Sequence, residues 1–194
     1  CRDGILKGLY AAKPAKTGTR LSAQLLGSGS IMVQVLEAQA YLAEHYDIGA
    51  TVWSVTSYVE LHRDALECQE FNLENPSLEP KTPYVSECLD STEGPIVAAS
   101  DFVRSLSDLI RPHLTKNMIS LGTDGFGLSD TREDLRHFFK VDTKHIVAAV
   151  LSAFVTTGEI PPEQYSDARK NTGIARAKRK SLILISICEL LAVT

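Results

Sequence analysis

The residues best suited to chemistry lie in one short stretch, where a glycine-rich turn is followed by acidic and histidine side chains. Gly122, Gly125 and Gly127 free the backbone for positive φ or for close approach to another chain. Backbone amides at such a turn, just before a helix, can bind a small anion. The glycine order does not match a dinucleotide-binding motif, and the Lys-Ser/Thr pair of a P-loop is missing. We therefore treat the stretch as a candidate for an interface or an anion contact through Gly122, Asp124, Gly125, Phe126, Gly127, Ser129, Asp130 and His137.

The other polar side chains of catalytic type are more simply explained by structural roles. Asp124, Asp130 and Asp134 are typical of turns and helix caps rather than of acid–base pairs. The histidines show neither a His-Glu-x-x-His motif nor a metal-ligand spacing with cysteine, so we expect no metal site. For His137, one turn after Glu133, an exposed helical position and a place in a subunit or domain interface both stay open. No Gly-x-Ser-x-Gly motif is present to provide a nucleophilic serine.

A second glycine turn, Gly27-Ser-Gly29, also lies between an apolar run and a helical pattern. The third glycine of a dinucleotide motif would fall at position 32, which is Met32, so the motif fails. We interpret the segment as a tight strand-to-helix turn with Ser30 as the helix cap.

Alternating strand and helix patterns position both turns. Short apolar or β-branched runs predict strands over residues 21–26, 51–56, 96–99 and 118–121. Helical spacing predicts helices over residues 31–46, 57–71, 102–110, 143–157 and 161–171, with a further helix that starts at Thr131 and has Leu135, Phe138 and Phe139 on its apolar face. The expected caps are Ser57, Ser100 or Asp101, Asp130 and Asp142, with a stop at Gly158.

The remaining segments connect these elements. Residues 75–83 contain three prolines and must form a loop, and residues 84–89 fit either a short helix or a strand. Strands separated by single helices, each ending in small or hydroxyl residues, indicate an α/β fold with a mainly parallel sheet and helices on both faces.

Six collinear segments, within roughly residues 5–160, resemble the C-terminal domain of the homodimeric pyruvate dehydrogenases of the transketolase superfamily. They are Leu25-Leu-Gly-Ser-Gly-Ser30, Val52-Trp-Ser-Val-Thr-Ser57 with Glu60-Leu61 and Arg63-Asp64, Pro83-Tyr-Val85, Gly94-Pro-Ile-Val-Ala-Ala-Ser-Asp101, Gly122-Thr-Asp-Gly-Phe-Gly127 with Ser-Asp-Thr-Arg-Glu133, and Leu-Arg-His-Phe-Phe139 with Val-Asp142. The resemblance implies a three-layer α/β/α domain whose sheet of about five strands includes one antiparallel strand. The residue pattern alone does not supply that strand direction.

The resemblance also implies a function for a larger parent enzyme. Enzymes of this family decarboxylate pyruvate with thiamine diphosphate and Mg²⁺ and pass the acetyl group to a lipoyl carrier on the dihydrolipoamide acetyltransferase of the complex. Their superfamily holds diphosphate and Mg²⁺ with a Gly-Asp-Gly sequence followed by asparagines, and this chain has no Gly-Asp-Gly. We therefore expect no catalytic or cofactor-binding residue here, and a structural role in a cytoplasmic homodimer beside the preceding catalytic domains. Leu128 replaces the usual arginine of the family, so any ion pair of that arginine is lost.

Composition and cysteine usage fit this interpretation. The chain of 194 residues has a net charge of -4, which gives no reason to expect a nucleic acid or an anionic membrane as partner. Its four cysteines form no Cys-x-x-Cys pair, so we expect free thiols in a reducing cytoplasm, with a disulfide as the alternative.

Three regions are expected along the chain. Residues 1–20 are a linker from a preceding domain, since the chain opens on Cys1 and carries Pro14 and Gly18 without apolar periodicity. Residues 21–172 form the transketolase C-terminal-like domain. Residues 173–194 are an atypical basic and apolar tail, whose apolar part of about 13 residues is too short to span a membrane. A membrane anchor, a packed C-terminal segment and a tail foreign to the family are the alternatives for it.

Two other functions stay open on the sequence alone. The first is a stand-alone α/β module that binds a nucleotide or another anion at its glycine turns. The second is a pseudo-enzyme or a degraded fragment that keeps dimer formation without catalysis.

Overall fold

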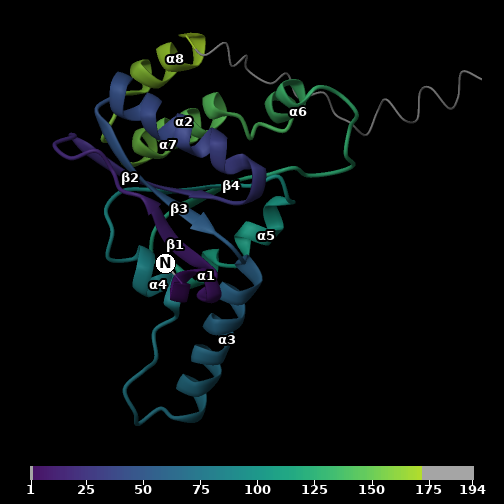
Figure 1. Cartoon of the computed structure of the whole chain (residues 1–194). Helices are drawn as coiled ribbons and strands as arrows, with labels where there is room; N and C mark the ends of the chain where they lie inside the picture. Colours follow the sequence, from purple (N-terminus) through teal and green to yellow (C-terminus); the bar gives the residue numbers. More distant parts are fainter. Residues whose placement is uncertain (1, 172–194) are drawn as a thin grey trace, which may run out of the picture.

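The computed structural model describes residues 2–171, and a five-stranded sheet runs through the centre of this part (Figure 1). Its strands are β1 (Leu9–Lys13), β2 (Leu21–Gly27), β3 (Ile48–Val55), β4 (Ile96–Ala99) and β5 (Met118–Leu121). They lie in the spatial order β1-β3-β2-β4-β5, and every neighbouring pair is parallel except β1 with β3. The mainly parallel sheet with one antiparallel strand is thus confirmed.

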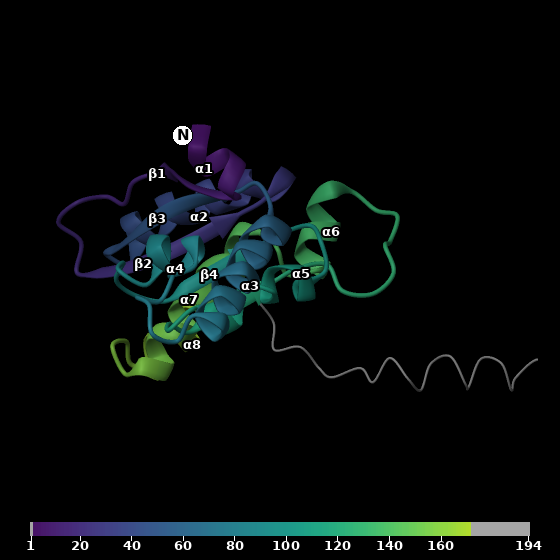
Figure 2. The same ribbon diagram turned by 90° about the horizontal axis from the view of Figure 1, so that it is seen from below.

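Helices cover both faces of the sheet and make three layers (Figures 1 and 2). One face carries α2 (Met32–His45), α7 (Thr143–Thr157) and α8 (Pro162–Asn171). The other face carries α1 (Arg2–Lys7), α3 (Tyr58–Glu74), α4 (Tyr84–Leu89) and α5 (Arg104–Asp108). Two short 3-10 turns, η1 (Gly29–Ile31) and η2 (Arg111–His113), and helix α6 (Arg132–Phe138) complete the described elements. The α/β/α architecture is therefore confirmed, and residues 84–89 form a helix.

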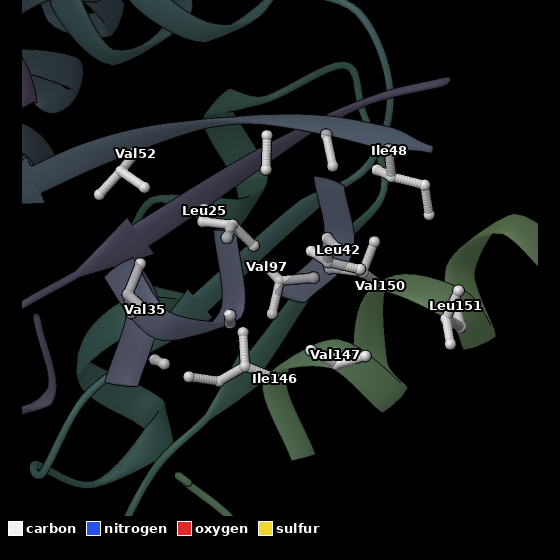
Figure 3. Packing of buried hydrophobic residues seen from close by; sticks show 14 of the residues in the cluster. Leu25, Val35, Leu42, Ile48, Val52, Val97, Ile146, Val147, Val150 and Leu151 are labelled. Atoms are coloured by element: carbon white, nitrogen blue, oxygen red, sulfur yellow. The ribbon is translucent and has the colours of Figure 1, made fainter. Parts of the chain in front are cut away.

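Two apolar clusters, one on each face of the sheet, hold the layers together. Figure 3 shows Leu42 of α2 and Val150 of α7 beside the sheet residues Leu25 and Val97, and all four side chains are almost fully buried. The strand neighbour Leu26 belongs to the cluster on the opposite face. Because consecutive strand residues point to opposite faces and both faces are covered, β4 is a continuous apolar run in the sequence.

Strand β1, Leu9–Lys13, lies within residues 1–20, for which the sequence predicted a linker without strands. The strand lies at the edge of the sheet, where Leu9 is opposite Val55 and Lys13 is opposite Val52. Only Leu9 is buried in β1, and its last three residues are exposed. The strand therefore lacks the apolar alternation by which strands are recognised in a sequence.

Helix caps were predicted correctly where the side chain bonds an amide three residues later. Ser57 accepts a hydrogen bond from the Glu60 amide at 3.1 Å and begins α3. Asp142 accepts one from the His145 amide at 2.9 Å and begins α7. Gly158, with φ of 83°, ends α7 in the left-handed conformation, as expected.

The cap predicted at Asp130 is wrong by one residue. The cap of α6 is Thr131, whose hydroxyl accepts a hydrogen bond from the Asp134 amide at 3.2 Å. Asp130 instead accepts a hydrogen bond from the Thr131 amide at 2.7 Å. Adjacent Asp and Thr side chains are both good caps, so the sequence alone did not distinguish them.

The caps predicted at Ser30 and at Ser100 or Asp101 are also wrong. Ser30 lies inside η1, and its hydroxyl donates to Asp101 rather than accepting from a helical amide. Helix α5 is shorter than the predicted 102–110, and its cap residue Val103 makes no side-chain cap bond. Ser100 accepts from the Phe102 amide, which places it in a turn before the helix.

Further sequence expectations concern cysteines and membrane spans. Cys68 and Cys88 are free thiols. Among the described residues, no helix combines the length and the apolar character needed to cross a bilayer. The tail predicted over residues 173–194 lies outside the described residues.

Candidate functional site

The carboxyl ends of β2, β4 and β5 meet at one end of the sheet, and the strand order reverses between β2 and β4. In open parallel sheets, this reversal point is the usual place for ligands. Here its side chains bond to one another: Ser28 Oγ donates to Ser100 Oγ at 2.9 Å, and Ser30 Oγ donates to Asp101 Oδ2 at 3.1 Å. These hydroxyl and carboxylate groups at the reversal point are therefore already hydrogen-bonded to one another within the domain.

The glycine turn, residues 122–130, leaves β5 and is held against α5 at its beginning. A Cβ on Gly122 would lie 2.6 Å from the Phe102 carbonyl oxygen, so the two backbone segments touch there. Asp124 accepts the Arg104 amide at 3.0 Å and forms an ion pair with its guanidinium at 2.5 Å. The Arg104 backbone amide and side chain hold the pKa of Asp124 below its usual range. Asp124 thus anchors the turn and is ionised at neutral pH.

Beyond Asp124 the turn projects away from the sheet, as the green segment before α6 shows in both views (Figures 1 and 2). Gly125 has φ of 90°, and Phe126 at the tip is 97% exposed. Leu128 and Phe102 are also more than half exposed. The Phe102 carbonyl oxygen accepts a hydrogen bond from the Thr123 amide at the start of the turn. We call Phe102, Phe126 and Leu128 the contact surface. Exposed large apolar side chains, two on the turn and one beside its base, are of the kind that protein contacts bury.

A cavity of about 400 Å³ lies between the glycine turn and α6. Gly127 and Asp130 line it from the turn, and Arg132 and Arg136 line it from the helix. Arg136 also donates to the Ser30 carbonyl oxygen at 3.1 Å, which ties α6 to η1. Asp101 and Asp130 balance the two guanidinium groups around the cavity, so its charge does not clearly favour an anion.

His137 does not join the other predicted site residues. It lines a separate cavity of about 540 Å³ that opens between α6, α2 and the start of α7. His137 Nδ1 lies 2.8 Å from Asp142 Oδ2, and His145 Nδ1 lies 2.6 Å from Asp142 Oδ1. We call these three residues the His-Asp-His cluster.

The carboxylate of Asp142 is the centre of this cluster. Burial alone would raise the pKa of Asp142, but hydrogen bonds from the His145 ring and amide and from the His137 ring outweigh it and lower the pKa to about 2. Asp142 is therefore ionised at neutral pH, and two imidazole rings share it.

Sequence reasoning missed the cluster because it depends on an unusual turn. Lys140 has φ of 60° and ends α6 in the left-handed conformation, where glycine is the common residue. The Lys140 amide donates to the His137 carbonyl oxygen at 3.1 Å, and the Val141 amide donates to that of Arg136 at 2.9 Å. This pair of bonds is a Schellman motif. The only available signal was His145 three residues after its cap, Asp142.

The predicted site residues thus divide into separate groups. Gly122 and Asp124 fix the turn to α5, Gly127 and Asp130 line the cavity beside α6, and Phe126 is exposed at the tip. Ser129 is also exposed, and His137 belongs to the His-Asp-His cluster. Phe138, expected on the apolar face of α6, is 61% exposed.

Sequence comparison extends this description. Residues 8–142 match the family described as transketolase-like TK C-terminal domain. The chain is 41% identical over 181 residues to the pyruvate dehydrogenase E1 component of Pseudomonas aeruginosa, an alignment that covers 93% of this chain and 20% of that protein. With the Escherichia coli K12 protein of the same name, identity is 40% over 86% of this chain and 18% of the relative. The chain therefore spans about a fifth of the length of the curated relatives it matches.

Solved structures show the same fold at low sequence identity. Transketolase from Leishmania mexicana superposes with a TM-score of 0.51 at 18% identity, over 79% of this chain and 19% of that chain. A split gene transketolase, described as an inactive beta4 tetramer, has a TM-score of 0.51 at 17% identity, over 77% of this chain and 43% of that chain. With its sheet order, its one antiparallel edge strand and the match over residues 8–142, the chain belongs to the transketolase-like C-terminal domain family.

Proposed function

We propose that this chain is the C-terminal domain of a thiamine-diphosphate-dependent pyruvate dehydrogenase E1 component. One observation carries the proposal: 41% identity extends over 93% of this chain, yet covers only 20% of the relative. The parent enzyme would decarboxylate pyruvate and transfer the acetyl group to a lipoyl carrier, with that chemistry performed by the other four fifths of the protein.

The residues of this domain do not fit the cofactor of that reaction. Among the described residues, the His-Asp-His cluster is the one group of three side chains with metal-ligand spacing. Its two imidazoles and one carboxylate are a poor match for Mg²⁺, which prefers oxygen ligands in octahedral geometry. We derive no catalytic step from this domain, and its proposed role is structural.

The proposed structural role is contact with the rest of the enzyme through the contact surface. Phe126 is 97% exposed at the tip of a turn whose base is fixed by the ion pair between Arg104 and Asp124. Burying one phenylalanine side chain contributes about 1.5–3 kcal/mol, and the fixed base lowers the entropy lost on contact. The surface would join this domain to the preceding catalytic domains and to the second subunit of a cytoplasmic homodimer. Association with a dihydrolipoamide acetyltransferase is part of the same proposal.

A fusion protein tests this role. The Escherichia coli E1 component is cut where its similarity to this chain begins, and this chain replaces the removed part. We expect the fusion to form a dimer and to decarboxylate pyruvate with thiamine diphosphate and Mg²⁺. The same fusion carrying Phe126→Asp should lose activity or dimerisation, because a charge at the tip would have to be buried without a partner.

Leu73→Asp is the matched control, since Leu73 is 82% exposed near the end of α3, and this helix runs away from the glycine turn (Figure 1). The control fusion should keep both dimerisation and activity. Equal behaviour of the Phe126→Asp and Leu73→Asp fusions would contradict a contact role for the glycine turn. An inactive parent fusion whose domains are folded would count against the assignment to this enzyme.

A stand-alone anion-binding module is the second candidate, and the position of the 400 Å³ cavity, rather than its balanced charge, is the observation behind it. The cavity lies beside the strand-order reversal and presents Arg132 and Arg136. The amides at the start of α6 do not add to it, because Asp130 and Thr131 already accept from the amides of Thr131 and Asp134. Isothermal titration of the chain with ATP and with NAD⁺ separates the candidates. Binding that is lost in Arg132→Gln would support the module, and absence of binding would support the E1 assignment.

A further inference from the structure

The His-Asp-His cluster has the composition of a transition-metal site, a property unrelated to the proposed enzymatic role. His137, Asp142 and His145 each offer one ligand atom, and these atoms all lie within 4.8 Å of one another. Both histidines approach through Nδ1, and their ring centroids are 5.1 Å apart. Two imidazoles that converge on one ionised carboxylate form a donor set suited to Zn²⁺, Ni²⁺ or Cu²⁺.

Two of the three side chains are held in place by the fold. The side chains of Asp142 and His145 are 15% and 12% exposed. Asp142 caps α7 and His145 lies in its first turn, and the apolar face of this helix is buried in the core. The Asp142 Oδ1 atom accepts the His145 amide at 2.9 Å, which leaves Oδ2 for a further partner. Two ligands on one fixed helical turn reduce the entropy lost when a metal binds.

The third ligand is brought close by the Schellman turn at Lys140. This turn reverses the chain between His137 on α6 and Asp142 on α7, and the buried Val141 fixes it to the core. The side chain of His137 is 55% exposed, so its ring can adjust. In a tetrahedral site with bonds of about 2.0–2.1 Å, ligand atoms are about 3.3 Å apart. His137 Nδ1, which lies 2.8 Å from Asp142 Oδ2, therefore has to move outward by only about 0.5 Å, which a small side-chain rotation supplies.

The charges around the cluster do not oppose a cation. The adjoining cavity is lined by three other carboxylates and three basic side chains, namely Glu37, Glu133, Asp134, Arg132, Arg136 and Lys144. These charges cancel formally, and Asp142 adds one negative charge. The cavity of about 540 Å³ also gives water access to the cluster.

We propose that the His-Asp-His cluster binds one zinc-like divalent transition metal through His137 Nδ1, His145 Nδ1 and Asp142 Oδ2, with water as the fourth ligand. Each neutral imidazole binds through the Nδ1 lone pair and carries its proton on Nε2. The metal then replaces two hydrogen bonds to Asp142 by three coordinate bonds. It links the end of α6 to the start of α7 and so stabilises the helix that forms one wall of the 400 Å³ cavity.

Zinc titration of the full chain tests the proposal. The chain is treated with EDTA, desalted and titrated with ZnCl₂ by isothermal calorimetry, with MgCl₂ and CaCl₂ in parallel. We expect one zinc-dependent binding event per chain, no comparable event with Mg²⁺ or Ca²⁺, and a rise in Tm with Zn²⁺. Cobalt in place of zinc should give visible bands without thiolate charge transfer, because no cysteine is a ligand. Thiolate bands at the same stoichiometry would overturn the proposal.

Single substitutions locate the binding event. His137→Gln should weaken zinc binding by more than about 100-fold, which exceeds the effect of removing a group that only orients a metal ligand. The Tm without metal should change little, because this side chain is exposed. His62→Gln is the matched control: its Nδ1 lies 3.3 Å from His113 Nε2, and this pair is a competing site for zinc. The proposal would be overturned if the unsubstituted chain did not bind zinc. It would also be overturned if His137→Gln bound zinc unchanged, or if only His62→Gln lost the binding.

Discussion

Replacing Gly94 by alanine should destabilise the fold much more than the same replacement at Gly18, although both glycines have φ of 78°. Gly94 precedes β4 and lies against the first residues of β2. An ideal Cβ at Gly94 would lie 1.6 Å from the Ser22 carbonyl oxygen. At Gly18, no heavy atom lies within 4 Å of such a Cβ. The two substitutions therefore share the backbone strain of alanine at positive φ and differ in the steric clash.

The structure gives the size of the difference. Alanine at positive φ costs about 1 kcal/mol or slightly more at either position, partly offset by the lower entropy of the unfolded chain. At residue 94, the backbone must also move by about 1.4 Å to reach the tightest Cβ contact of 3.0 Å. That movement stretches two hydrogen bonds of 2.9 Å, from the Gln24 amide to the Pro95 carbonyl oxygen and from Gln24 Nε2 to that of Glu93. Their loss at about 1 kcal/mol each brings the cost of Gly94→Ala to roughly 3 kcal/mol or more.

Urea denaturation followed by circular dichroism measures both variants. The free energy of unfolding should fall by about 1 kcal/mol or less for Gly18→Ala and by at least about 3 kcal/mol for Gly94→Ala, because only the second substitution carries the clash. An equal loss of unfolding free energy in the two variants would refute the reasoning. It would show that the Ser22 carbonyl leaves room for an alanine Cβ at residue 94. The comparison does not depend on the unfolded state, since glycine is replaced by alanine in both.

Three other substitutions have expected outcomes of known sign. The Tyr58 hydroxyl is buried and has no hydrogen-bond partner among the described residues. Tyr58→Phe should therefore raise the free energy of unfolding, measured in urea, by about 1 kcal/mol. A lower free energy of unfolding would mean that the hydroxyl is hydrogen-bonded in solution. Lys140→Gly should raise Tm, because glycine adopts φ of 60° without the strain of about 1 kcal/mol that a side chain adds. A lower Tm would show that Lys140 is not strained in this conformation. The pKa of Asp142 is lowered to about 2, so the ionised carboxylate contributes about 2 kcal/mol to the free energy of unfolding. This contribution is present above the usual carboxyl pKa near 3.9 and is lost as the pH falls toward 2. In EDTA-containing buffer, the stability gap between the unsubstituted chain and Asp142→Asn should therefore narrow between pH 7 and pH 3, and a constant gap would contradict this origin.

The sequence predicted the central part of the fold because local signals and burial agree there. Residues 96–99 form an apolar run, and β4 is buried along its whole length between two helical layers. Ser57 and Asp142 cap their helices with the bonds expected from their spacing, and Gly158 ends α7. In each case one residue type suffices to define the local conformation.

The edges of the fold were harder to predict, because their conformations depend on distant residues. Strand β1 buries only Leu9, and its antiparallel pairing with β3 is a tertiary interaction that a short polar run does not reveal. Lys140 adopts the left-handed conformation because Val141 is buried behind it, although lysine has no preference for that conformation. The location of His137 beside Asp142 follows from this turn, so histidine spacing alone could not predict the cluster.

The proposed contact surface would let this α/β domain use the ligand-binding end of its sheet for a protein contact. In parallel sheets, the side chains at the carboxyl ends of the strands are usually free to bind a ligand. Here Ser28 bonds to Ser100 across the reversal point, and Asp124 is paired with Arg104. With these groups engaged, the exposed Phe126 is the strongest available source of binding energy at this end, and that energy suits a protein partner.

Helix α6 connects this end of the sheet to the His-Asp-His cluster. Arg136 on α6 donates to the Ser30 carbonyl oxygen, while the neighbouring His137 bonds to Asp142. Because rotation of the exposed His137 ring suffices for coordination, a bound metal would restrain α6 without displacing Arg136. Metal binding at the cluster would thus stabilise the wall of the 400 Å³ cavity, which Arg136 lines, without any contact between the metal and that cavity.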